Sequence, residues 1–181
     1  MKSLIRTVLF TLLASLPLWL AVAPVHAVTV SVAPAETTVT VGDNFTLRSV
    51  TTAFPDLKAY ELIYSFNSAL ITSQGVNPGD VLTGSGNPFQ AYPQPDNSLP
   101  TGTITYDAAM LTGATHGPGI LGFLKFHAEA VGDTPVQCVL VDFRDPLNDQ
   151  TLPSCVSGLV HIRGPVPVSP STWGRIKTLY R

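Results

Sequence analysis

The stretch Ala59-Tyr-Glu-Leu-Ile-Tyr-Ser-Phe-Asn67 alternates large apolar residues with smaller or polar ones. Residues spaced by two share one face of an extended strand. The large side chains are those of Tyr60, Leu62, Tyr64 and Phe66. The opposite face carries Glu61, Ile63 and Ser65. The pattern therefore predicts a strand that buries one side in a core and leaves the other side free to meet a ligand.

Similar short segments recur on both sides of this strand, separated by Gly, Pro and Asp. They are residues 28–32, 37–41, 45–50, 102–106, 120–130, 136–143 and 156–162. A loose stretch from Gly75 to Gly102, rich in Pro and Gly, is expected to hold one short strand near Phe89–Tyr92. Eight or nine short strands without a convincing helix among them predict an all-β fold, an antiparallel β-sandwich.

The two ends of the chain differ from this body. Residues 1–27 have a basic start, an apolar run and a small-residue exit at Ala27, which is typical of a secretory signal peptide. A retained membrane anchor is the alternative. The sandwich is expected over residues 28–163, followed by a Pro-rich linker, 164–170, and a tail, 171–181. The tail is either a short amphipathic helix, ordered against a partner, a membrane or its own sandwich, or a frayed end.

Charge excludes one class of partner. Removal of residues 1–27 takes away Lys2 and Arg6, which leaves 8 Lys and Arg against 12 Asp and Glu, a formal charge of −4. Nucleic-acid surfaces need clustered Lys and Arg. The body of the chain has no such cluster, so we expect no nucleic-acid partner.

The residues that carry chemistry are scattered. His116, His127 and His161 have no metal-ligand spacing, and no nucleophile elbow is present. We therefore expect no enzyme and no cofactor. The densest acidic group, Asp142 to Asp149, departs from calcium-loop spacing and contains Arg144, so a solvated turn is favoured and Ca²⁺ is the minor alternative.

The two cysteines, Cys138 and Cys155, have sixteen residues between them. In an exported protein they are expected to form a disulfide. Closing a loop of this length contributes about 3 kcal/mol in the chain-entropy model. Two unrelated buried thiols are the alternative.

The order of the segments resembles that of cohesin domains. The resemblance covers residues 28–163 and is carried by Val39-Thr-Val-Gly-Asp-Asn-Phe-Thr46, the stretch 57–70, Val76-Asn-Pro-Gly-Asp-Val-Leu82, Gly102-Thr-Ile-Thr-Tyr-Asp-Ala-Ala109, Gly119-Ile-Leu-Gly-Phe-Leu-Lys-Phe-His-Ala128 and Ser157-Gly-Leu-Val-His-Ile162. The resemblance implies a nine-stranded jelly roll that binds a dockerin-like protein partner.

The resemblance also implies which face meets the partner. In cohesins this face is built from the third, fifth, sixth and eighth strands. The matching positions here are Ala59, Glu61, Ile63, Ser65, Thr103, Thr105, Asp107, Gln137 and Val139. Nothing is transferred onto the long stretch 75–101, because it aligns poorly.

The sequence thus predicts a secreted, non-catalytic binding module that docks a protein in polysaccharide breakdown or surface assembly. It is expected to be extracellular, periplasmic or associated with the cell surface. Carbohydrate binding is one alternative, through Tyr60, Tyr64 and Tyr106 if these face water; their spacing favours the core. A structural surface protein tethered by its tail is the other alternative.

Overall fold

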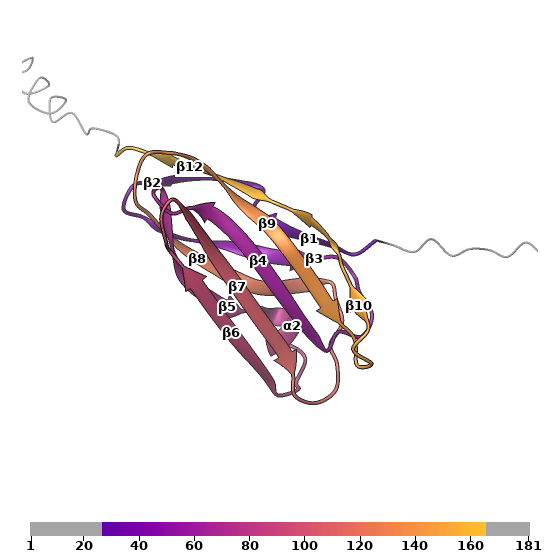
Figure 1. The fold of residues 1–181 in the computed structure, drawn as a ribbon. Helices are drawn as coiled ribbons and strands as arrows, with labels where there is room; N and C mark the ends of the chain where they lie inside the picture. The colour runs from indigo at the N-terminus through magenta and orange to yellow at the C-terminus, as the bar shows by residue number, and fades with distance from the viewer. Residues whose placement is uncertain (1–26, 166–181) are drawn as a thin grey trace, which may run out of the picture.

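A computed structural model describes residues 27–165, which form two β-sheets packed face to face (Figure 1). In this part of the chain the elements are β1 (Thr29–Ala33), β2 (Glu36–Thr40), β3 (Asn44–Thr51), β4 (Ala59–Asn67), β5 (Ile71–Pro78), α2 (Asp80–Thr83), β6 (Phe89–Asp96), β7 (Thr101–Met110), β8 (Gly119–Ala128), β9 (Gly132–Arg144), β10 (Gln150–Thr151), β11 (Ser154–Val156) and β12 (Gly158–Arg163). One sheet has the order β11-β1-β3-β8-β5, and the other has the order β2-β12-β9-β4-β7-β6, with β10 on β9.

Strand β4 lies near the middle of the larger sheet, between β9 and β7. Its burial alternates as the sequence predicts, since Leu62 and Tyr64 are fully buried and Tyr60 and Phe66 are each 3% exposed. Strand β8 supplies the facing layer with Leu124 and other buried side chains. The predicted all-β sandwich is therefore confirmed, and its core is the apolar side of these strands.

Two tyrosine hydroxyls tie the sheets together across this core. Tyr64 Oη on β4 lies 2.6 Å from Ser49 Oγ on β3. Tyr60 Oη donates to the carbonyl oxygen of Leu121 on β8 over 2.8 Å. A buried hydroxyl without a partner costs free energy, so these bonds allow large tyrosines in the core and set the position of one sheet against the other.

The sheets are mixed, whereas the sequence predicts an antiparallel sandwich. Strand β1 pairs in parallel with β11, and β2 pairs in parallel with β12. Both parallel pairs join the beginning of the described chain to its end. Because β1 and β2 belong to different sheets, the first and last strands complete both layers, and local strand patterns do not reveal such long-range pairs.

Three further details differ from the sequence prediction. Twelve strands are present among residues 27–165 where nine were expected, and β10 and β11 have only two and three residues. Part of the loose stretch is ordered, because β5 runs to Pro78, the one-turn helix α2 follows, and β6 runs to Asp96. The predicted signal peptide, the tail and all of the linker beyond residue 165 lie outside the described residues, apart from Ala27.

The predicted disulfide is confirmed. Cys138 on β9 is bonded to Cys155 on β11, with the two Cα atoms 5.9 Å apart. Strand β9 belongs to the larger sheet and β11 to the smaller one. The bond therefore links the two layers covalently.

Replacing both cysteines by serine should lower the free energy of unfolding by about 3 kcal/mol, because the unfolded chain regains the entropy of an open loop. Urea denaturation of the double variant measures this loss. The unchanged protein under a thiol reductant is the control and should lose a similar amount. Equal stability of oxidised and reduced protein would show that the bond adds nothing.

Alkaline pH should also destabilise the fold. Burial raises the pKa of Tyr64 from its ordinary value of 10.0 to about 12, partly offset by the Ser49 hydrogen bond, and burial likewise raises the pKa of Tyr60 and Tyr106. The unfolded chain then loses these protons first, so the stability due to the neutral phenols is complete below about pH 10 and is lost as the pH rises through the folded pKa values.

Urea denaturation at a series of pH values above about 10 tests this expectation. Tyr64→Phe should be less stable at neutral pH, because Ser49 loses its partner, yet its stability should fall less steeply with alkaline pH. An identical slope in both proteins would exclude Tyr64 as the cause.

Candidate docking face

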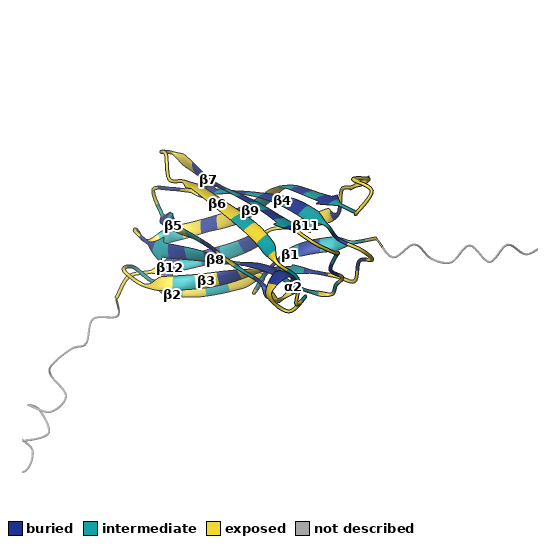
Figure 2. Ribbon diagram, turned by 90° about the horizontal axis from the view of Figure 1, so that it is seen from below, coloured by how far each residue is buried: buried dark blue, intermediate teal, exposed yellow. Residues whose placement is uncertain are grey.

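The outward side of β6, β7, β4 and β9 is the candidate site, and we call it the docking face. The four strands are adjacent in the larger sheet, in that order. Their outward-facing residues are exposed or half-buried, and Figure 2 shows the burial class of each residue along the ribbon. Strands β4 and β7 alternate regularly between buried and half-buried residues, so the position of every side chain on this face follows from the strand register.

The register brings the nine predicted residues together. Glu61 lies opposite Asp107, Ile63 opposite Thr105, and Ser65 opposite both Thr103 and Gln137. Ser65 Oγ donates a long hydrogen bond of 3.4 Å to Gln137 Oε1. Ala59 starts the β4 row, and Val139 lies on β9 with 61% of its surface exposed. The predicted residues thus form one continuous surface over three strands.

A β-bulge in β9 changes which residues reach this face. The pairing of β9 with β4 shifts between Ile63 and Tyr64, so Tyr64 pairs with Cys138, Ile63 pairs with Leu140, and Val139 is the extra residue. A bulge leaves one residue unpaired and reverses the alternation beyond it. Ile63, Val139 and Leu140 consequently form an apolar centre.

Sequence reasoning missed the residues beyond the bulge. Leu140, Asp142 and Arg144 alternate with the buried Val141 and Phe143, so they lie on the docking face. A strict period of two, started at Gln137, assigns them to the core side. The sequence held one signal of the bulge. Val136, Val141 and Phe143 are all apolar, yet Val136 has an even number and the other two have odd numbers, so one strict alternation cannot bury all three.

The docking face has an open depression at the end where β4 begins. It has a volume of about 430 Å³ and is lined by Ala59, Tyr60, Glu61, Gln90, Tyr92, Asp107, Ala108, Ala109, Asp142 and Arg144. Glu61 lies directly opposite Asp107 on β7 and Asp142 on β9. Three carboxylates therefore stand side by side across three strands, and we call this the acidic depression.

One cation offsets part of this charge. Arg144 donates from a terminal guanidinium nitrogen to Asp142 Oδ2 over 2.9 Å, and Gln150 Nε2 donates to the same oxygen over 2.8 Å. Glu61 has no such partner among the described residues, and Asp107 only accepts from Gln94 Nε2 at 3.3 Å. Like charges directly opposite each other on neighbouring strands are destabilising. The carboxylate row therefore lowers the free energy of unfolding of the sandwich.

Strand β6 adds an aromatic edge to the depression. Tyr92 is 55% exposed and pairs with Asp107 across the β6–β7 ladder. The sequence predicts no binding residue on this strand, because the stretch 75–101 aligns poorly with cohesins. In contrast, the three tyrosines considered for sugar stacking are buried: Tyr60 is 3% exposed, and Tyr64 and Tyr106 are 0% exposed. They therefore cannot stack on a sugar ring.

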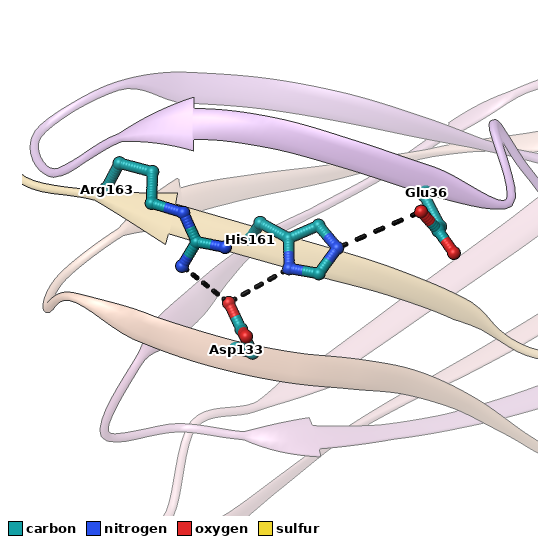
Figure 3. Close-up of polar contacts among 4 residues, drawn as sticks. All are labelled: Glu36, Asp133, His161 and Arg163. Carbon is teal, nitrogen blue, oxygen red and sulfur yellow. Dashed lines mark hydrogen bonds and ion pairs between the residues drawn. The ribbon is translucent and has the colours of Figure 1, made fainter.

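A second group of charges lies on the outward side of β12 and β9, at the end opposite the depression (Figure 3). His161 Nδ1 donates to Asp133 Oδ1 over 2.9 Å, and Arg163 donates to the same oxygen over 2.7 Å. His161 Nε2 lies 4.0 Å from Glu36 Oε2 on β2. The His161 hydrogen bond, followed by Arg163, lowers the pKa of the Asp133 carboxyl below its ordinary value. The group joins β2, β12 and β9 at this edge.

The histidines and the other acidic residues of the described part, 27–165, make mainly local contacts. His127 Nδ1 bonds Asn44 Oδ1 at 2.8 Å, and His116 lies in an exposed loop. Within residues 27–165, no group of three or more His, Cys, Asp or Glu side chains is placed to hold a metal ion. Asp145 instead accepts backbone hydrogen bonds from Leu147 and Asp149, which closes a turn. No helix in the same part of the chain is long and apolar enough to cross a membrane.

Comparison with solved structures identifies the class of fold. A non-cellulosomal cohesin from the archaeon Archaeoglobus fulgidus superposes with a TM-score of 0.59 at 16% identity, over 83% of this chain and 98% of that one. A Clostridium thermocellum cohesin in complex with a dockerin gives 0.62 at 14% identity, over 76% and 100%. A cohesin module of a Clostridium perfringens family 33 glycoside hydrolase gives 0.59 at 12% identity, over 77% and 97%.

The chain therefore has the fold of cohesin modules, as the order of its sequence segments predicted. By sequence alone, no protein-family model and no curated protein matches it. The agreement thus lies in the path of the backbone, while few residues are identical.

Neutralising the centre of the carboxylate row should stabilise the fold. Glu61→Gln keeps the size of the side chain and removes two cross-strand repulsions, so we expect a gain of about 0.2–1 kcal/mol in the free energy of unfolding. Urea denaturation at low salt measures the gain, which should shrink in high salt. Asp56→Asn, in an exposed loop, is the matched control and should change little. A destabilised Glu61→Gln variant would contradict repulsion as the dominant effect.

Proposed function

We propose that this chain is an exported, non-catalytic module that binds a dockerin-like protein through the docking face. The observation that carries the proposal is the register of β4 with β7 and β9. It gathers the nine predicted residues on one surface around the apolar centre of Ile63, Val139 and Leu140. An apolar centre with a polar rim is the usual composition of a protein interface.

The comparisons support a protein partner. Cohesins from Clostridium thermocellum and Acetivibrio cellulolyticus with this fold have been solved bound to dockerins. We therefore assign the chain a docking role in polysaccharide breakdown or surface assembly.

Export is supported by two features of the chain. The first is the predicted signal peptide, residues 1–27, and the second is the disulfide between Cys138 and Cys155. Disulfides persist in oxidising compartments. The proposed location is therefore extracellular, periplasmic or on the cell surface.

Charge insertion at the apolar centre tests the docking face. Immobilised protein should capture a small set of secreted proteins from the source organism, to be identified by mass spectrometry and then titrated as purified partners. Ile63→Asp should weaken the binding by about 2 kcal/mol or more, or about 30-fold in Kd, because it places a charge at the centre of the interface.

Thr46→Asp is the matched control, since Thr46 is exposed on β3 of the other sheet. It should leave capture unchanged, and both variants should keep their circular dichroism spectra. Undiminished binding by a folded Ile63→Asp variant would rule out this face.

Carbohydrate binding is the second candidate, and one observation favours it. Tyr92 is an exposed aromatic residue beside a depression that carries carboxylates and the Gln90 amide. Affinity electrophoresis in gels that contain different polysaccharides should show retardation that Tyr92→Ala abolishes. Unretarded migration in every gel would leave this candidate without support.

A further inference from the structure

The charges of this chain are divided unevenly between the sandwich and the tail. Residues 28–163 contain all 12 Asp and Glu of the chain and five of its Lys and Arg. The linker and tail, 164–181, contain no acid and three cations, Arg175, Lys177 and Arg181. The sandwich is therefore strongly anionic, and the charged side chains of the segment that follows it are all basic.

The tail also carries large apolar side chains among these cations. Trp173, Ile176 and Tyr180 are spaced by three and four residues, a spacing that would place them along one side of a helical turn. A surface that receives this segment needs carboxylates beside apolar and aromatic contacts.

The acidic depression and its surroundings offer this combination. Glu61, Asp107 and Asp142 form the carboxylate row, and only Asp142 has a cation beside it. Tyr92 borders the depression, and Leu140 and Ile63 adjoin it along the sheet. We propose that the tail of the same molecule binds in the acidic depression and covers part of the docking face.

The length of the linker suits this contact. Strand β12 ends beside the start of β9, because Ile162 pairs with Gly132. The depression lies at the other end of β9. Gly164 follows His161, which pairs with Asp133, by three residues, so the span from Gly164 to the level of Asp142 is twelve strand residues, or about 40 Å. Lys177 follows Gly164 by thirteen residues, and an extended segment of that length spans about 40 Å, so the basic end of the tail reaches the depression.

The path along β9 is open. Gly164 is exposed, and a methyl group in place of its α-hydrogen would meet only Val131, at 3.8 Å. Pro135, Gln137 and Val139 are exposed along the route. Hydrogen bonds from His161 and Arg163 to Asp133 hold the end of β12 against β9 at the point where the linker begins.

Because the linker holds the tail close to the depression, a weak contact is enough to keep the tail bound. A short linker that spans the two sites gives an effective concentration in the millimolar range. Opposite charges add an attraction that falls with salt. If the proposed function is right, the tail competes with the partner for the docking face, and this consequence is the only step that rests on that function.

Tryptophan fluorescence tests the contact without any partner. Trp173 is the only tryptophan after residue 27, so the chain Val28–Arg181 reports the tail alone. Bound Trp173 should emit at shorter wavelength and resist acrylamide quenching more than Trp173 in a free peptide of residues 164–181. The shift should disappear in high salt and should not depend on protein concentration.

Charge reversal locates the contact. The double variant Arg175→Glu, Lys177→Glu changes only residues beyond the sandwich, so the sandwich should still fold. Its Trp173 emission should equal that of the free peptide. Glu61→Lys with Asp107→Lys should do the same, and all four changes together should restore the shift. Glu36→Lys with Glu129→Lys, both exposed and on elements that do not line the depression, is the control and should keep the shift.

Three results would overturn the proposal. Emission of the unchanged chain equal to that of the free peptide would show that the tail is not bound. A shift that survives the Glu61 and Asp107 reversals would place the tail elsewhere. A shift that grows with concentration, together with dimers in sedimentation, would mean that the tail binds a second copy. None of these results depends on whether the docking face binds a protein partner.

Discussion

Burial of one side of β4 between two sheets is the constraint on which the rest of the molecule depends. Tyr60, Leu62, Tyr64 and Phe66 leave water together, and the Tyr64 and Tyr60 hydroxyls find partners on the opposite sheet. Apolar burial supplies the driving force, and the hydroxyl bonds set the relative position of the layers. Because successive side chains of a strand alternate, the same burial places Glu61, Ile63 and Ser65 outside.

The docking face combines this regular alternation with one local irregularity. The bulge in β9 inserts Val139 and brings Leu140 opposite Ile63, which enlarges the apolar surface at the centre. The disulfide of Cys138 lies at the same point and bonds this strand to the other sheet. The covalent link therefore supports the part of β9 where the ladder with β4 is interrupted.

The carboxylate row is a cost to stability that either proposed ligand would reduce. Glu61 lies opposite Asp107 and Asp142, and Arg144 neutralises only part of the row. Cross-strand pairs of like charge weaken a sheet, whereas a bound cation relieves them. The proposed partner and the proposed tail contact both draw on this one feature, so they are alternatives for the same surface.

The sequence by itself determined the class of fold, the sides of β4 and β7, and the disulfide. These follow from period-two spacing and from the presence of two cysteines whose separation allows a disulfide. Only the tertiary structure decided the parallel pairs at the ends of the sandwich, the extent of β5 and β6, and the positions of Leu140, Asp142 and Tyr92. The physical reason is that a bulge reverses the alternation beyond it, and that long-range strand pairs are chosen by the packing of whole sheets, which no local pattern records.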